Sequence, residues 1–526
     1  MKFVLASALC LLSAAAMAQN TVPLINITSL SIDEVAQELT INYQLSDADG
    51  DACEVWLKYS EDGANYFEVI PGLSVSGDAG DGIEPGDALT AVWNYEGITA
   101  GIGNVHIQIW GSDGQEVSIA DMVNQVDASE LLSTLQTVEG ERHYTAAPTH
   151  LADVRTFIFD AFADAGLQTE NHDFIYADTE MANILGRKPG ARDESITYII
   201  DGHFDGVPNS PGADDNGSAV AGVLEALRIL SQYNFEHSIR FIGFDAEELG
   251  LRGSQRYVQN AIEPFEEING VLNFEMIGYY SDEPNSQSLP VGFELLFPDA
   301  AQEISDDDNR GNFLTVVGNV DSNPLISAYI EASETYVPEL RLISIAVPGT
   351  GTIAPDLRRS DHSRFWDAGM QALMLTDGSE FRNFNYHTPG DVIATLDFGF
   401  MENVVKATVA AAAQLAVPIS ASHDQADLSD VLSVHDHSHK FPAELNIFPN
   451  PSNGILTLEV SQVPHAFRAR LEVFAINGQR QHREIVHFSS GSNTATINLQ
   501  NLPAGAYILH LNASDGVASA GFIIEK

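Results

Sequence analysis

The strongest constraint on the fold is an alternation of two kinds of apolar segment between residues 128 and 417. Short apolar runs of strand length cover residues 196–200, 239–244, 271–274 and 372–375, and longer runs of helical length cover residues 219–233 and 401–415. Strands that alternate with helices along a chain form a sheet covered by helices on both faces. We therefore predict that residues 128–417 form a three-layer α/β/α domain with a mixed sheet.

All-β patterns flank this domain on both sides. Between residues 19 and 127, apolar and polar residues alternate with the period of two that is expected of half-buried strands, as at Leu39, Ile41, Tyr43 and Leu45. This pattern predicts an immunoglobulin-like β-sandwich. Residues 418–440 are polar and predict a linker, and residues 441–526 return to short β runs separated by turns, which predicts a second β-sandwich.

The balance of charge excludes several classes of partner. The chain has 24 Lys and Arg against 74 Asp and Glu, which gives a net charge of −50. Binding to nucleic acid requires a basic face that neutralises phosphates, so nucleic acid is excluded as a partner. The same charge disfavours adhesion to anionic lipid.

The first residues have the features of a signal peptide. Lys2 is followed by an apolar run that ends in Ala16-Met17-Ala18, the small-residue pattern of a cleavage site. The run is shorter than the ~20 residues of a membrane helix, so we expect residues 1–18 to be removed and the mature chain to have no membrane span. Cys53 is then the single cysteine, and an exported chain of this kind has no internal disulfide.

Candidate metal ligands follow the predicted strands of the middle domain. They are His203, Asp215, Glu248, Glu275 and His387, with Glu247 beside Glu248. In open α/β sheets, ligands bind at the carboxyl ends of the strands. A single Asp or His after a strand is usually a cap or a solvated loop residue, but two imidazoles and three carboxylates together suit two divalent ions that share a carboxylate. If one of the adjacent glutamates holds metal, the other is free to act as a base.

The order of these motifs resembles the co-catalytic zinc aminopeptidase family, which also contains glutaminyl cyclases and glutamate carboxypeptidases. The resemblance spans nearly all of residues 128–417 and is carried by His203-x-Asp205, Pro211–Ser218 with Asp214-Asp215-Asn216, Glu247-Glu248, Asn273–Gly278 and His387-Thr388-Pro389. Two positions differ: many members have Asp in place of Glu275, and the usual serine after H-x-D is Gly206.

This resemblance implies a role for each residue. Two zinc ions would be bound, with Asp215 as the ligand that bridges them. His203 and Glu275 would each bind a separate part of the pair, and Glu248 and His387 would be the remaining ligands. Glu247 would be the general base that deprotonates a zinc-activated water, and Asp205 would orient His203. The Asp215–Asn216 peptide bond would be cis. Arg359 and Tyr386 resemble residues that line the substrate pocket, where they would polarise the scissile carbonyl; the alternative is a surface arginine and a packing tyrosine.

The C-terminal segment resembles the sorting domain of type IX secretion substrates. The motifs are Phe448-Pro449-Asn450-Pro451 near its start and Leu502-Pro503-Ala504-Gly505-Ala506-Tyr507 near its end. This implies the type IX machinery as a partner and a location outside, or on the surface of, a gram-negative bacterium. The alternative is an accessory sandwich that binds substrate or a surface.

The expected function is therefore that of a secreted zinc aminopeptidase acting on the N-termini of peptides. A carboxypeptidase or glutaminyl cyclase on the same scaffold is the first alternative, although a cyclase would need one metal ion and not the full ligand set. A non-catalytic adhesion module is the second alternative, and it would have no need of Glu247 beside Glu248.

Overall fold

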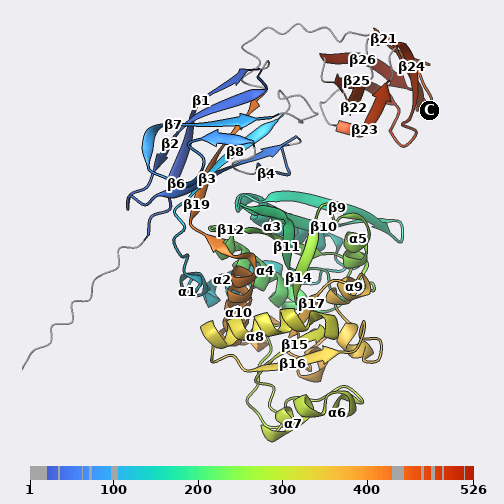
Figure 1. The fold of residues 1–526 in the computed structure, drawn as a ribbon. Helices are drawn as coiled ribbons and strands as arrows, with labels where there is room; N and C mark the ends of the chain where they lie inside the picture. Colours follow the sequence, from blue (N-terminus) through green and yellow to red (C-terminus); the bar gives the residue numbers. More distant parts are fainter. Residues whose placement is uncertain are drawn as a thin grey trace, which may run out of the picture.

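An eight-stranded mixed sheet organises the middle of the chain (Figure 1). Its strand order is β16-β15-β17-β14-β11-β13-β10-β9, and the four strands β17, β14, β11 and β13 are parallel to one another. The bounds are β9 Gln168–Tyr176, β10 Thr179–Lys188, β11 Asp193–His203, β13 His237–Phe244, β14 Glu267–Phe274, β15 Leu314–Asn319, β16 Leu342–Val347 and β17 Ala372–Thr376. The four predicted strands all lie within this set.

The computed structural model of the chain describes residues 20–33, 36–61, 63–69, 74–95, 105–428, 444–463, 467–475, 480–488, 491–513 and 516–526. The predicted signal peptide, residues 1–18, lies outside the described residues, as does the end of the predicted linker.

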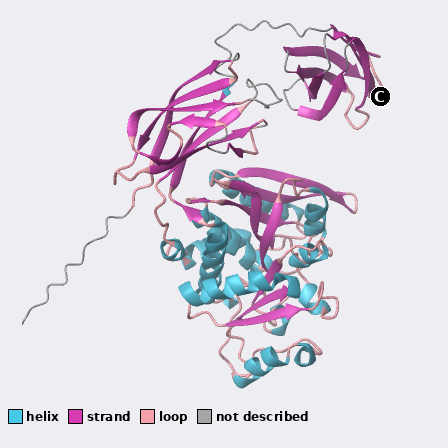
Figure 2. Ribbon diagram, viewed as in Figure 1, coloured by secondary structure: helices cyan, strands magenta, loops and turns pink. Residues whose placement is uncertain are grey.

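Helices cover both faces of the central sheet (Figure 2). Successive side chains of a strand point to opposite faces, and Ile199 and Ile200 of β11 accordingly belong to different apolar cores. One core includes α1 Ile119–Val123, α2 Ala128–Val138, α3 Pro148–Asp164, α4 Ala219–Leu230, α8 Asn323–Tyr336 and α10 Phe398–Ala416. The other includes α5 Arg252–Asn260, α6 Phe293–Leu296, α7 Pro298–Asp306 and α9 His362–Asp367. The prediction of a three-layer α/β/α domain is confirmed.

The N-terminal part is a pair of sheets around one apolar core. The sheets have the orders β1-β2-β7-β5 and β19-β8-β3-β4, with β6 on β3. Leu39 and Ile41 from the first sheet pack in the same core as Val55 and Ile109 from the second. The bounds are β1 Leu24–Asp33, β2 Glu38–Ser46, β3 Cys53–Ser60, β4 Phe67–Val69, β5 Val75–Gly77, β6 Gly80–Ile83, β7 Gly86–Asn94 and β8 His106–Ser112.

The linker prediction is wrong for its first ten residues. β18 (Pro418–Ile419) pairs with β12 (Asn234–Phe235), and β19 (Ala421–Asp427) pairs antiparallel with β8 along its whole length. Residues 421–427 are mostly polar because β19 is an edge strand with few deeply buried side chains. The ring of His423 in this strand stacks on Trp110, with centroids 4.2 Å apart. The chain thus returns to the N-terminal sandwich after completing the α/β domain.

The C-terminal part is a second two-sheet β domain with its own core. The sheets have the orders β20-β21-β24 and β23-β22-β25-β26. Leu458 of one sheet and Leu471 and Leu509 of the other are buried in that core. The bounds are β20 Glu444–Phe448, β21 Ile455–Val463, β22 Phe467–Ala475, β23 Arg480–Phe488, β24 Gly491–Asn498, β25 Gly505–Ala513 and β26 Gly516–Ile524.

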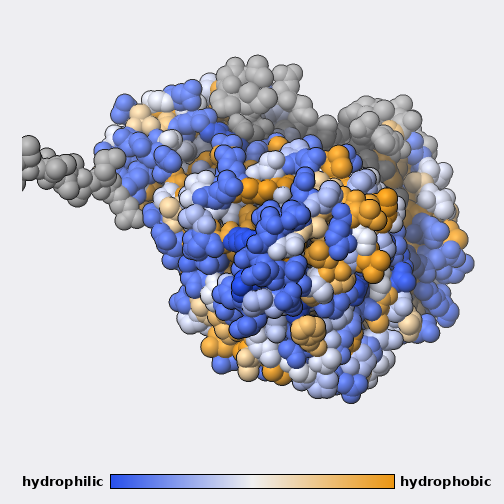
Figure 3. Space-filling model, turned by 90° about the horizontal axis from the view of Figure 1, so that it is seen from below, coloured by the Kyte–Doolittle hydropathy of each residue, from blue (hydrophilic) through white to orange (hydrophobic). Residues whose placement is uncertain are grey.

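The surface is mainly hydrophilic with local apolar patches. Figure 3 views the molecule from the end at which α6 and α7 lie, and apolar residues interrupt the hydrophilic surface there. Exposed apolar side chains in this part of the chain include Val291, Leu295 and Ile353. Within the described ranges, no helix is both long enough and apolar enough to cross a membrane.

A buried ion pair joins the N-terminal sandwich to the α/β domain. The side chain of Lys58 in β3 is only 1% exposed; its Nζ lies 2.7 Å from Glu194 Oε1 and donates to the carbonyl of Gly190 at 2.6 Å. Arg187 pairs with the other oxygen of Glu194 at 3.1 Å. Trp56 donates from Nε1 to the carbonyl of Ala191 at 3.1 Å. The segment that connects β10 to β11 is therefore fastened to the sandwich by polar contacts shielded from water.

We expect Lys58→Met to lower the free energy of unfolding by about 3 kcal/mol, because it leaves a buried carboxylate with one cation instead of two. The control is Lys406→Met, which breaks the partly exposed i,i+4 pair with Glu402 and should cost under ~1 kcal/mol. Urea unfolding followed by tryptophan fluorescence measures both. Equal losses in the two variants would contradict the claim that the interface depends on the buried pair.

Candidate metal centre

The predicted ligands come from loops at the carboxyl ends of the parallel strands. His203 is the last residue of β11, Glu247 and Glu248 follow β13 closely, and Glu275 follows β14 directly. His387 lies in the loop after β17. Parallel neighbours end at the same edge of a sheet, so these side chains are brought to one place although they are far apart in sequence.

The six acidic and imidazole side chains form two groups. His203, Glu247 and Glu275 form one, and Asp215, Glu248 and His387 form the other; within each group the candidate ligand atoms lie within 4.8 Å of one another. The implied arrangement is therefore wrong in one respect: His203 and Glu275 lie together in one group and not on separate parts of the pair. Their proximity follows from adjacent strands, since β11 pairs directly with β14.

Asp215 connects the two groups. Its Oδ1 lies 3.5 Å from His203 Nε2, and its Oδ2 lies 2.9 Å from His387 Nε2. Glu248 Oε1 lies 3.2 Å from the same nitrogen of His387. In the first group, His203 Nε2 lies 3.5 Å from Glu275 Oε2 and 3.9 Å from Glu247 Oε2. The two carboxylate oxygens of Asp215 thus face different groups, which is the geometry a bridging ligand requires.

The loop that carries Asp215 is held from several sides. The Asp215–Asn216 peptide bond is cis, as the resemblance implied. Asp391 accepts hydrogen bonds from the backbone N–H groups of Asp214 at 2.9 Å and Asp215 at 3.1 Å. Asn216 donates to the carbonyl of Phe274 at 3.1 Å, which ties this loop to the end of β14. Gly212 has φ of 61°, and a Cβ there would lie 2.5 Å from the carbonyl oxygen of Asp215, so a side chain is excluded.

Asp205 holds His203 and the two glutamates in their relative positions. Its Oδ1 accepts the backbone N–H of Glu247 at 2.9 Å, and its Oδ2 accepts that of Glu248 at 3.2 Å. Oδ1 also lies 3.4 Å from Nδ1 of His203. Because Nδ1 faces Asp205, Nε2 is the nitrogen directed at the other members of the group, and among the described residues it has no hydrogen-bond partner.

Burial and crowding shift the pKa values of these groups. Burial raises the pKa of Glu247 well above its usual range, and burial with the neighbouring Asp215 raises that of Glu248 to about 7. Burial lowers the pKa of His387, but Asp215 and Glu248 outweigh it and raise the value to about 10. The site therefore holds more negative charge than its own imidazoles balance. A divalent cation would balance that charge and would give Nε2 of His203 a partner, so the residues fit a metal.

Arg359 and Tyr386 lie at the edge of the second group. Arg359 donates from Nη2 to the Tyr386 hydroxyl at 2.9 Å and forms an ion pair with Glu380. The Tyr386 ring stacks on His387 with centroids 3.7 Å apart. Both residues also line a pocket that includes Glu275. The structure thus brings both side chains next to the predicted ligands and to the pocket.

Two supporting residues were missed in the sequence. Arg142 is fully buried and donates to the carbonyl oxygens of Gly212 at 2.7 Å and Phe204 at 2.8 Å, so it supports the loops that carry Asp215 and Asp205. Asp391 supports the same loop from the far side. Asp391 could have been suspected because it stands four residues after His387, but a lone arginine before the α/β pattern carries no signal.

Comparison with known proteins gives two family matches. Residues 183–412 match Peptidase family M28, and residues 446–525 match the Secretion system C-terminal sorting domain. Both resemblances stated from the motifs are thereby confirmed.

Individual relatives cover parts of the chain. The uncharacterized protein YfbL of Escherichia coli is 28% identical over 267 residues, which are 48% of this chain and 77% of that protein. Aminopeptidase YwaD of Bacillus subtilis is 44% identical over 219 residues, which are 40% of this chain and 39% of that protein. The chain thus spans well under half the length of the Bacillus relative. Among solved structures, the LapA aminopeptidase of Legionella pneumophila aligns with a TM-score of 0.45 and 21% identity over 57% of this chain and 78% of that one.

We expect Asp205→Asn to weaken zinc binding by about 10–100-fold. The Asp205 carboxylate has two acceptor oxygens for two backbone N–H groups and His203, whereas an asparagine amide has only one. Competition with a chromophoric chelator measures the affinity. Asp282→Asn, an exposed carboxylate that contacts none of the predicted ligands, is the control. Unchanged zinc affinity in Asp205→Asn would show that the loop keeps its shape without this carboxylate.

Proposed function

We propose that this chain, whose central domain belongs to peptidase family M28, is a secreted zinc aminopeptidase that removes N-terminal residues from peptides. The observation that carries the proposal is the position of Asp215 between two ligand groups, with Glu247 beside them. The 44% identity to a protein named aminopeptidase supports the reaction class. The match to a sorting domain supports secretion.

Two zinc ions would be held by five side chains. His203 and Glu275 would bind one ion, Glu248 and His387 would bind the other, and Asp215 would bind both. Nitrogen and carboxylate ligands in this ratio are those that zinc takes in catalytic sites. When bound, such ions supply a water molecule of lowered pKa and polarise a carbonyl group.

Glu247 is the proposed general base. Its Oε2 lies 3.9 Å from His203 Nε2, farther than the 3.5 Å of both Glu275 and Asp215, which favours Glu247 as the group left out of coordination. It would accept the proton of the attacking water and deliver it to the nitrogen of the leaving amine. Burial already favours its protonated form, so it can hold that proton between the two steps.

Arg359 and Tyr386 are the proposed electrophilic residues. The Tyr386 hydroxyl accepts a hydrogen bond from Arg359, which leaves its own proton free to be donated to a substrate carbonyl oxygen. Negative charge develops on that oxygen as the water attacks, and a donor fixed by stacking on His387 needs no reorganisation to stabilise it.

The proposed route of export is type IX secretion, with the C-terminal β domain as the signal and a gram-negative bacterium as the host. The family match over residues 446–525 supports this route. The expected final location is the cell surface or the medium.

We expect opposite zinc contents in two neighbouring variants. Glu247→Gln should keep both zinc ions and lose about 10²–10⁴-fold in kcat, because it removes the proton carrier and no ligand. KM should change little, since the lost interaction belongs to the transition state. Glu248→Gln should lose zinc and activity together. Elemental analysis beside an assay with leucine and alanine anilides measures all three quantities.

Normal turnover by Glu247→Gln would contradict its role as the base, and loss of zinc from that variant would make it a ligand. Wild-type stoichiometry of one zinc ion, with cyclisation of N-terminal glutamine and no anilide hydrolysis, would indicate a glutaminyl cyclase. Zinc-free wild-type protein that binds surfaces would indicate an adhesion module.

We expect the exported enzyme to lack the residues after about 440, because a sorting domain is removed at an accessible segment next to it. Intact-mass measurement of the secreted protein is the test, and a variant truncated at residue 440 should remain inside the cell. A secreted species that still ends in Lys526 would favour an accessory module over a sorting signal.

A further inference from the structure

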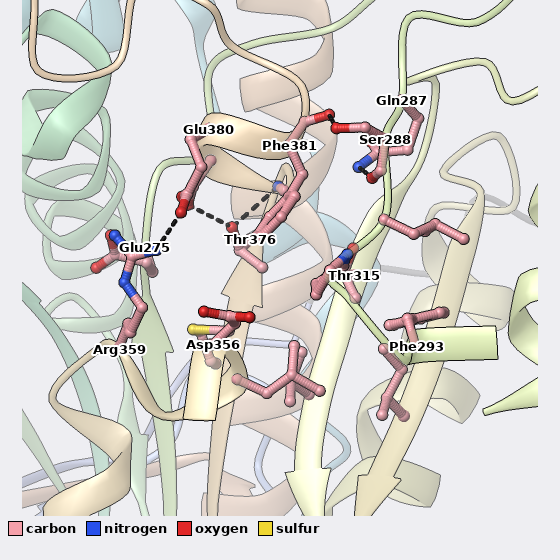
Figure 4. Close-up of a pocket in the computed structure, with 18 of the residues that line it drawn as sticks. Glu275, Gln287, Ser288, Phe293, Thr315, Asp356, Arg359, Thr376, Glu380 and Phe381 are labelled. Carbon is pink, nitrogen blue, oxygen red and sulfur yellow. Dashed lines mark hydrogen bonds and ion pairs between the residues drawn. The ribbon is translucent and has the colours of Figure 1, made fainter. Parts of the chain in front are cut away.

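A deep pocket opens beside the candidate metal centre. Glu275 forms part of its wall, and about 650 Å³ of space, including space open to solvent, lies within it. Arg359 and Tyr386 border the same space (Figure 4). A side chain that enters here would therefore belong to a residue whose carbonyl group lies at the metal centre.

The walls of the pocket are apolar and rigid. They are formed by strands β15, β16 and β17 and by segments packed on them, and include Phe293, Phe313, Val317, Ile345, Leu357 and Met374. All six belong to one buried core of the α/β domain. Such walls can pack against a long aliphatic chain and do not shift to suit a poorly fitting one.

Four acidic or basic side chains line this pocket, and three are already engaged. Glu275 belongs to the ligand cluster and accepts a hydrogen bond from Ser360 Oγ at 2.8 Å. Arg359 and Glu380 form an ion pair with each other. The fourth is Asp356: within the described part of the chain its carboxylate accepts no hydrogen bond and has no cation close enough for an ion pair, and the charge of Arg359 acts on it only from a greater distance.

The position of Asp356 makes that carboxylate available to a substrate. Figure 4 shows it in the middle of the pocket view, with Arg359 on one side and Thr315 and Phe293 on the other. Asp356 is partly exposed, and the apolar walls beside it reduce the hydration of its charge, which has a free-energy cost. A cation brought in by the substrate would remove that cost.

We propose that the pocket receives the first side chain of the substrate and that Asp356 makes it selective for lysine and arginine. This inference rests on the aminopeptidase function proposed above. The aliphatic stem of either side chain packs against Leu357 and Met374, and its charged end reaches the Asp356 carboxylate in a charge-assisted contact.

The same charges exclude the opposite class of substrate. An N-terminal Asp or Glu would meet Asp356 and Glu380, while the single cation of the pocket, Arg359, is already paired. Neutral apolar residues fit the walls but leave Asp356 unpaired. The expected order is therefore basic, then apolar, then acidic.

Lysine and norleucine give the sharpest comparison, because norleucine has the stem of lysine without its amine. With zinc-loaded full-length enzyme, kcat/KM for the lysine anilide should exceed that for the norleucine anilide by about 10–100-fold, the worth of a hydrogen bond to a charged group. Asp356→Asn should bring this ratio close to one by lowering kcat/KM for the lysine anilide, while kcat/KM for the norleucine anilide should change less than about threefold. Asp367→Asn, which removes a carboxylate paired with Arg358 outside the pocket, should leave the ratio unchanged.

Calorimetric titration with free L-lysine and L-norleucine gives a second measurement that does not depend on turnover. Wild type should bind lysine more tightly, and Asp356→Asn should bind both equally. Hydrolysis of both anilides with a ratio near one that Asp356→Asn does not alter would overturn the inference and leave the aminopeptidase proposal standing. Failure of wild type to hydrolyse any aminoacyl anilide would overturn both.

Discussion

The candidate metal centre gathers an excess of buried acidic side chains at one edge of the central sheet. Asp215, Glu247, Glu248 and Glu275 surround only two imidazoles, and burial penalises each carboxylate that stays ionised. Such a cluster persists only if its surroundings fix it and a cation completes it. Asp205 meets the first need by accepting two backbone N–H groups from the glutamate loop.

The candidate ligands and the pocket beside them are carried by different strands of one sheet. The ligand groups follow β11, β13 and β14, whereas the pocket beside them is walled by β15, β16 and β17. Glu275 belongs to both, so a side chain in the pocket and a carbonyl at the metal centre can be held at once. Asp356 is thus a pocket residue that belongs to neither candidate ligand group.

The N-terminal sandwich forms one structural unit with the α/β domain. The Lys58–Glu194 pair is shielded from water, and β19 adds a strand to the sandwich after the α/β domain is complete. Removing the first sandwich would expose Glu194 and leave β19 without its partner β8. The C-terminal β domain has its own core, which is consistent with a module that can be separated from the rest.

The sequence by itself determined the α/β core, the set of candidate ligands and the two family resemblances, because apolar periodicity and motif order are local properties of the chain. It failed where a role depends on contacts across space. β19 reads as a polar linker because an edge strand needs few apolar residues. Arg142 carries no signal in the sequence because it acts by supporting a distant loop. Only the tertiary structure placed His203 and Glu275 in one group, through the pairing of β11 with β14. Only it directed Asp356 into a pocket built from three other strands, since a carboxylate's partner, or lack of one, is decided by what the fold brings next to it.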